Sequence, residues 1–209
     1  MKLHWAILST LLAGLPGIPL KSQVYLSEGF ESYPFPPVVS EWVPDGWSQE
    51  YVVGPDEPWQ YRNGGHTPDD PNWSVDPDVY DPRRNPPSAY EGTYNAIFFK
   101  QSSGNERTKL ITPEMDIEGG IIVELSFYLC QVPWDFGGSG PVNDVLRVYY
   151  KKGADSAWVL LQEYLDPIYD WELQTLVLPE PTSTYYVAFE GQTRWSANQQ
   201  EKEPEVPQR

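Results

Sequence analysis

The chain has 209 residues, with 30 acidic against 14 basic side chains and a formal net charge of −16 at pH 7. Phosphate backbones and anionic lipid surfaces repel such an acidic protein, so nucleic acids and membrane surfaces are excluded as expected partners. The length suits one domain, and the single cysteine, Cys130, excludes an intramolecular disulfide; we expect it to be a small buried apolar residue.

The first 23 residues have the pattern of a secretory signal peptide. Lys2 precedes an apolar run from Trp5 to Leu15, which a Gly/Pro break at residues 16–19 ends. This run is shorter than the roughly 20 apolar residues that a membrane span needs. We predict that residues 1–23 are removed on export; the alternatives are a buried N-terminal helix and an uncleaved anchor.

The next third of the chain predicts mainly loops. Residues 23–33 have an extended pattern, and the stretch to Pro87 is rich in Pro, Gly, Asp and Trp with little periodicity. Its tryptophans are too apolar for an open linker, so we expect much of it to lie against the folded domain. Residues 69–84 form the expected mobile insertion.

From Asn95 onward, apolar residues recur with the period of two that β-strands produce. The expected strands cover residues 95–100, 121–129, 145–150, 157–164, 172–178 and 185–190, with short segments at 110–113 and 115–117. Turn residues separate these segments at the spacing of an all-β sandwich. The polar tail 196–209 has no apolar periodicity, and we expect it to be disordered.

Several short motifs follow one another in order along residues 28–195. They are Gly29-Phe30-Glu31, Pro44-Asp45-Gly46-Trp47, Trp59, Ser88-Ala89-Tyr90-Glu91-Gly92, Asn95-Ala96, Leu110-Ile111-Thr112-Pro113, Met115-Asp116-Ile117, Leu125-Ser126-Phe127, residues 144–150, Trp158, Trp171, Leu178-Pro179 and Tyr186-Val187-Ala188-Phe189. In this order they resemble the choice-of-anchor J and cleaved-adhesin domains of secreted bacterial proteins, relatives of the MAM domain. The resemblance implies a MAM-like or concanavalin-like jelly-roll β-sandwich over residues 24–195, with antiparallel sheets and long aromatic loops, in a secreted or cell-surface bacterial protein.

The resemblance stops before the last strand of those domains. Their chains continue into a strand that carries two aspartates, whereas here the polar tail follows Trp195. This difference implies an open sheet position beside the N-terminal strand, which is a site for pairing or aggregation. A strand-donating partner, self-association or a shortened gene product would each account for it.

Recognisable catalytic motifs are missing from the sequence. It contains no GxSxG, HExxH or CxxC pattern, and His66 is the one histidine outside the expected signal peptide. Nucleophilic catalysis needs a histidine with positioned partners, and nothing near His66 suggests them. We therefore predict that the protein is not an enzyme.

Calcium is the expected cofactor, because it binds hard oxygen ligands and the chain is rich in carboxylates. Glu31 is a candidate ligand by the resemblance, and Asp144 is a second, in the loop before residues 145–150. A weaker group comprises Asp76, Asp78 and Asp81. The alternative is that Glu31 caps a strand end and that the aspartates form turns and add solubility.

Loop aromatics are the candidate ligand contacts. Trp134, Phe136, Trp59 and Trp73 lie in Gly- and Pro-rich stretches, where exposed rings stack on sugars or anchor protein interfaces. The alternative is that they plug the ends of the sandwich, and this core role is the one we prefer for Trp47, Trp158 and Trp171.

These observations favour a non-catalytic, calcium-stabilised recognition or adhesion module that binds an extracellular protein or glycan. The alternatives are an accessory domain of a secreted peptidase or other hydrolase, and a truncated family member without independent function.

Overall fold

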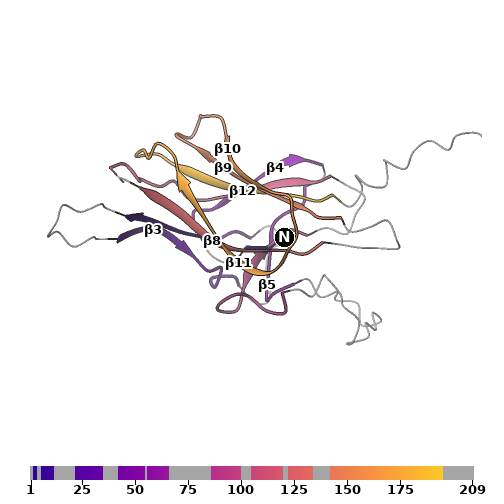
Figure 1. Cartoon of the computed structure of the whole chain (residues 1–209). Coiled ribbons are helices and arrows are strands. Elements are labelled where there is room, and N and C mark those ends of the chain that lie inside the picture. Colours follow the sequence, from indigo (N-terminus) through magenta and orange to yellow (C-terminus); the bar gives the residue numbers. More distant parts are fainter. Residues whose placement is uncertain are drawn as a thin grey trace, which may run out of the picture.

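The computed structural model describes residues 2–3, 6–11, 22–34, 42–54, 56–65, 86–99, 105–119, 122–133 and 142–194. In these residues the regular elements are strands of two antiparallel sheets, and no helix occurs (Figure 1). The all-β class predicted from the sequence is therefore confirmed. A helix long and apolar enough to cross a membrane is not found in the described part of the chain.

The larger sheet has seven strands in the order β3-β2-β8-β1-β6-β5, with β11 beside β8. They are β1 (Lys2–Leu3), β2 (Ala6–Leu11), β3 (Ser22–Glu28), β5 (Gln60–Arg62), β6 (Asn95–Ile97), β8 (Val123–Gln131) and β11 (Ile168–Leu178). Strand β8 is central, because β1 and β2 pair with one of its edges and β11 pairs with the other.

The smaller sheet has five strands in the order β10-β9-β12-β7-β4. They are β4 (Ser48–Val53), β7 (Arg107–Ile111), β9 (Val145–Lys151), β10 (Val159–Tyr164) and β12 (Tyr186–Gln192). In Figure 1 this sheet is the upper layer and the seven-stranded sheet is the lower layer.

Side chains from both sheets meet in a single core. In β8, Val123, Leu125, Phe127 and Leu129 are at most 1% exposed, as the period of two requires. The ring of Phe127 contacts the ring of Phe189 on β12 edge to face, with centroids 5.2 Å apart. Burial of these side chains is the main favourable term in folding, and it holds the two layers together as a sandwich.

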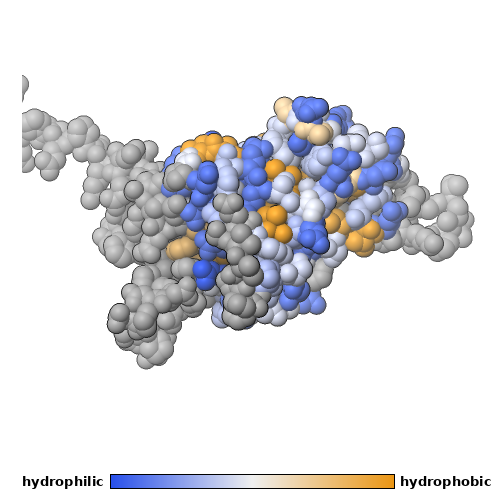
Figure 2. Space-filling model, turned by 180° about the vertical axis from the view of Figure 1, so that it is seen from behind, coloured by the Kyte–Doolittle hydropathy of each residue, from blue (hydrophilic) through white to orange (hydrophobic). Residues whose placement is uncertain are grey.

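Apolar residues fill this core, and some large apolar side chains are also exposed at the surface. On the side of the molecule shown in Figure 2, orange apolar surface lies in separate patches among blue polar surface. The side chain of Cys130 is buried, as expected.

The sheets approach closely where Gly191 of β12 faces Phe98. A Cβ atom at Gly191 would lie 2.5 Å from Phe98 Cδ1, so no larger residue fits there without movement. The Phe98 ring also contacts the ring of Trp59, at a centroid distance of 5.5 Å. The glycine therefore serves packing between layers rather than a turn.

The N-terminal segment lies in the larger sheet. Strand β2 pairs with β3 on one edge and with β8 on the other, and β1 lies between β6 and β8. The sheet position beside β3, which the resemblance implied to be open, is thus occupied by β2. Removal of residues 1–23 stays a prediction, but residues 2–3 and 6–11 have defined strand partners when they are present.

The region expected to be mainly loops also contains two strands. Strands β4 and β5 lie in residues 48–62, and both are integral to the sheets. The expectation was wrong there because β4 is an edge strand with both faces partly exposed and β5 is only three residues long, so neither has a clear hydrophobic pattern.

Candidate functional site

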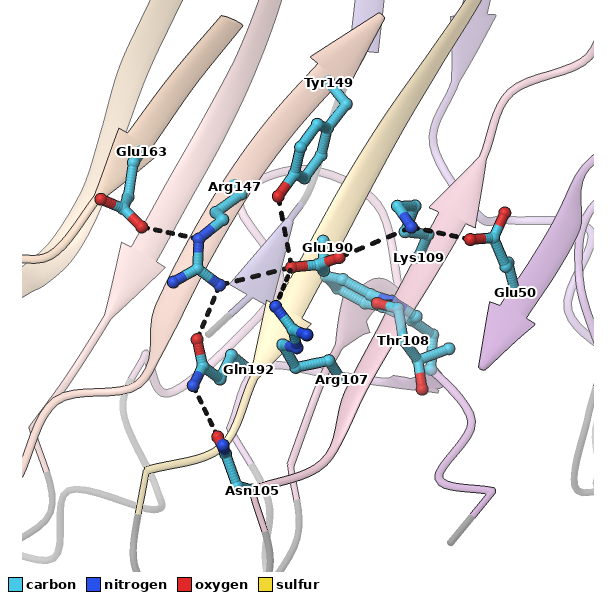
Figure 3. Close-up of polar contacts among 11 residues, drawn as sticks. Glu50, Asn105, Arg107, Thr108, Lys109, Arg147, Tyr149, Glu163, Glu190 and Gln192 are labelled. Atoms are coloured by element: carbon cyan, nitrogen blue, oxygen red, sulfur yellow. Dashed lines mark hydrogen bonds and ion pairs between the residues drawn. The ribbon is translucent and has the colours of Figure 1, made fainter. Parts of the chain in front are cut away.

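Five charged residues of alternating sign form one row across the outer face of the five-stranded sheet. In spatial order they are Glu163 on β10, Arg147 on β9, Glu190 on β12, Lys109 on β7 and Glu50 on β4 (Figure 3). Each residue is the direct cross-strand partner of the next, so the strand register places their side chains side by side. We call these five residues the charge row.

Glu190 is the centre of the charge row and is only 2% exposed. Its Oε1 atom accepts a hydrogen bond from Arg147 Nη1 at 3.3 Å and lies 3.7 Å from Arg107 Nη1, and its Oε2 atom lies 3.6 Å from Lys109 Nζ. The hydroxyl of Tyr149 also donates to Oε1, at 3.5 Å. A carboxylate can be buried at this position because several cations and donors compensate its lost hydration.

The two outer glutamates of the charge row bind the cations next to them. Arg147 Nε donates to Glu163 Oε1 at 2.6 Å, and Arg147 Nη1 donates to Gln192 Oε1 at 2.6 Å. Lys109 Nζ donates to Glu50 Oε1 at 2.7 Å. Burial alone would raise the pKa of Glu50, but the hydrogen bond and charge of Lys109 outweigh it, so the pKa lies below its usual value.

Aromatic side chains border the charge row. Lys151 Nζ lies 4.8 Å from the ring centroid of Trp158 and 4.8 Å from that of Tyr186. The indole Nε1 of Trp158 donates to Glu50 Oε2 at 3.3 Å. Trp158 precedes β10 at one edge of the sheet, while Glu50 lies on β4 at the opposite edge, so the β9–β10 connection reaches across the outer face.

The core role that the sequence favoured for Trp158 is therefore wrong. The indole is half-buried on the outer face of the sheet, held by Lys151 and Glu50. Trp47, in contrast, is 6% exposed and contacts Phe30 in the core, as expected.

One donor beside the charge row has no partner among the described residues. Arg107 Nε is buried, and no hydrogen-bond acceptor lies within reach of it in that part of the chain. The outer face therefore combines paired charges, aromatic rings and one unused donor in one place, which is a chemistry suited to binding a polar ligand.

The two predicted calcium ligands belong to separate hydrogen-bond networks. Glu31 Oε1 accepts the N–H groups of Thr93 and Tyr94 at 2.8 and 3.0 Å, which ties the end of β3 to the segment before β6. Asp144 Oδ1 accepts the N–H of Arg194 at 3.1 Å, and burial raises the pKa of this carboxyl. In the described residues no three His, Cys, Asp or Glu side chains form a group that could hold a metal.

Trp59 was predicted to contact a ligand, with a place in the core as the alternative, and the structure places it in the core. It is 0% exposed, and its Nε1 donates to the carbonyl of Thr108 at 3.0 Å. A buried indole cannot contact a ligand at the surface without rearrangement. Trp73, Trp134 and Phe136 lie outside the described residues, as do His66, Asp76, Asp78 and Asp81.

Comparisons with known proteins add no assignment. No protein-family model matches the chain, and a search of curated proteins found no similar sequence.

Proposed function

We propose that the chain is a non-catalytic extracellular or cell-surface recognition module that binds a glycan on the outer face of the five-stranded sheet. The observation that supports this proposal is the charge row with Trp158 and Tyr186 beside it. Sugar hydroxyls both donate and accept hydrogen bonds, and the row offers carboxylate acceptors together with cationic donors. Aromatic rings stack on the apolar faces of sugar rings.

The charge of the chain narrows the class of glycan. A net charge of −16 repels anionic polysaccharides, so the proposed ligand is a neutral glycan or one that carries amino groups. The proposal agrees with the resemblance to choice-of-anchor J and cleaved-adhesin domains, for which a jelly-roll sandwich with an adhesive role is expected.

Retention of the full chain on immobilised neutral and amino-bearing polysaccharides tests the proposal. We expect Trp158→Ala to reduce retention at least tenfold, because it removes the indole that reaches across the outer face. Tyr169→Ala is the matched control, since Tyr169 is 63% exposed on β11 of the other sheet. Loss of retention in Trp134→Ala but not in Trp158→Ala would move the binding site to the predicted loop and contradict the sheet-face proposal.

We also propose that calcium stabilises the domain through Glu31, with Asp144 as the second candidate ligand. A cation that binds only the folded state raises the melting temperature in proportion to the logarithm of its concentration. We expect thermal unfolding of the full chain to shift upward from EDTA to millimolar calcium, and to shift less in Glu31→Gln. Equal melting temperatures in EDTA and calcium would exclude this role, whatever the effect of Glu31→Gln on stability.

A further inference from the structure

A slot one strand wide lies between β3 and β8, and the N-terminal segment fills it. Strand β2 is six residues long and runs antiparallel to both neighbours. Leu8, for example, lies opposite Leu26 of β3 and opposite Leu125 of β8. The backbone of β2 therefore takes part in two hydrogen-bond ladders at once.

The segment in this slot is the one whose sequence predicts a removable signal peptide. Among the described residues, β3 pairs with β2 and with no other strand. Loss of residues 2–11 would unpair β6 at Ala96–Ile97 and β8 at Leu129–Cys130, where β1 pairs. It would also leave two facing edges beside the slot, one on β3 and one on β8 over Val123–Ser126. These edges would face each other at about twice the roughly 4.8 Å spacing of neighbouring strands.

Contacts outside the sheet hold β3 in place without help from β2. Tyr25 and Leu26 pack against the core, and Phe30, just after the strand, is 2% exposed. The Phe30 ring lies 5.4 Å from that of Tyr61, and Glu31 binds the backbone before β6. Anchored strands therefore frame the slot, and we expect β3 to stay in place when the occupant leaves.

We propose that the slot between β3 and β8 is a strand-acceptor site, which an extended apolar segment of a partner protein occupies once the N-terminal segment has been removed. Main-chain hydrogen bonds on both edges supply affinity for such a strand. A second processed copy would have lost the same segment, so the donor is a different chain. The slot lies in the seven-stranded sheet, so its occupation does not depend on glycan binding at the other sheet.

Acidic side chains lie next to the slot, at one end and near the other, and they indicate the charge of the partner strand. Ala6 lies opposite Glu28 of β3, and Ser9 lies opposite Glu124 of β8. Together with the net charge of −16, these carboxylates favour a donor strand flanked by lysine or arginine.

The test uses the full chain with a protease site inserted within residues 12–21, so that the protein folds intact and is cut afterwards. A fluorescent peptide of residues 1–12 is added, and its anisotropy is followed. We expect one peptide to exchange into each cut chain, whereas the same peptide with Leu8→Pro does not, because proline lacks an N–H and is excluded from central strands. An unrelated alternating apolar peptide should bind at least tenfold tighter with flanking lysines than with flanking glutamates.

Three results would overturn the proposal. The first is a cut chain that releases residues 1–12, keeps its melting temperature and binds no peptide, which would mean that the slot closes. The second is a released chain that forms a dimer and binds no peptide, which would make a second copy the occupant. The third is a chain that unfolds on release and does not refold when the peptide of residues 1–12 is added.

Discussion

Glu190 is the residue on which the charge row depends. Arg147 and Lys109 both direct cationic groups at its carboxylate from the neighbouring strands. Replacing the carboxylate by an amide leaves these cations without their central partner, and breaking a buried ion pair costs about 3–5 kcal/mol. Arg147 is 18% exposed and keeps Glu163, so we expect Glu190→Gln to lower the free energy of unfolding by about 2–3 kcal/mol, measured by urea denaturation.

The matched control is Glu180→Gln. Glu180 also pairs with a cation, Lys152, but this ion pair is on the surface, with Glu180 68% exposed. Solvent screens such pairs, so we expect no measurable change in the urea midpoint. Similar losses in the two variants would show that burial of Glu190 has no special importance.

None of the five charge-row residues was among the site residues predicted from the sequence. Glu50 and Glu163 lie far apart in the chain, and only the strand register brings them to one row with Glu190. An arginine or glutamate within an apolar strand, as at Arg147 and Glu190, was a usable signal for a polar outer face. Burial of Trp59 could not be predicted, because its Pro-rich surroundings carry no periodicity.

The strands were predictable where one face is core and the other is not. Alternation is clear in β8, where the structure shows a strand with both ends shifted by two residues. Strands β9 and β12 are buried over parts of both faces, and their β-branched and aromatic residues predicted them to within two residues at each end. The segment 115–117, by contrast, makes only an isolated bridge, between Met115 and Tyr185. An apolar run such as that of β2 is compatible with both a signal peptide and a buried strand, so sequence alone could not reveal its pairing.

Strand β12 packs against the opposite layer through a glycine, and this contact leads to a second prediction. Any Cβ atom at Gly191 overlaps the Phe98 ring. Overpacking of this kind costs about 1–3 kcal/mol, so we expect Gly191→Ala to lower the free energy of unfolding by that amount in urea denaturation.

A second substitution separates the steric effect from a general effect of replacing glycine. Phe98→Ala removes Cγ and Cδ1, the two atoms that would lie 2.5 Å from the new methyl group, so the double variant Gly191→Ala/Phe98→Ala should be more stable than the sum of the two single changes predicts. Gly119→Ala measures a different cost, because nothing lies within 4 Å of its Cβ position but its φ is +80°, so its loss of stability comes from backbone strain and not from overlap. Strict additivity for Gly191 and Phe98 would contradict the proposed contact.

The sandwich as a whole contains several tyrosines that link its stability to alkaline pH. Burial raises the pKa of Tyr164 to about 12 and raises the pKa values of Tyr61 and Tyr185 still further. A tyrosine in the unfolded chain has a pKa of about 10. The folded chain therefore holds these phenolic protons more tightly than the unfolded chain does.

The sign of the pH dependence follows from this difference. At a pH between the pKa values of the unfolded and the folded chain, the unfolded chain binds fewer protons. The stabilisation that these tyrosines give is therefore full below about pH 10, and the free energy of unfolding falls as the pH rises toward 12. We expect urea denaturation at pH 8, 10 and 11 to show this fall, and Tyr164→Phe to make it shallower by removing one of the groups. Tyr169→Phe, at an exposed position of β11, should leave the slope unchanged. Added negative charge on an already acidic chain also lowers the free energy of unfolding as the pH rises. The two variants separate the causes: different slopes of unfolding free energy against pH assign the fall to the buried tyrosine, whereas equal slopes assign it to net charge.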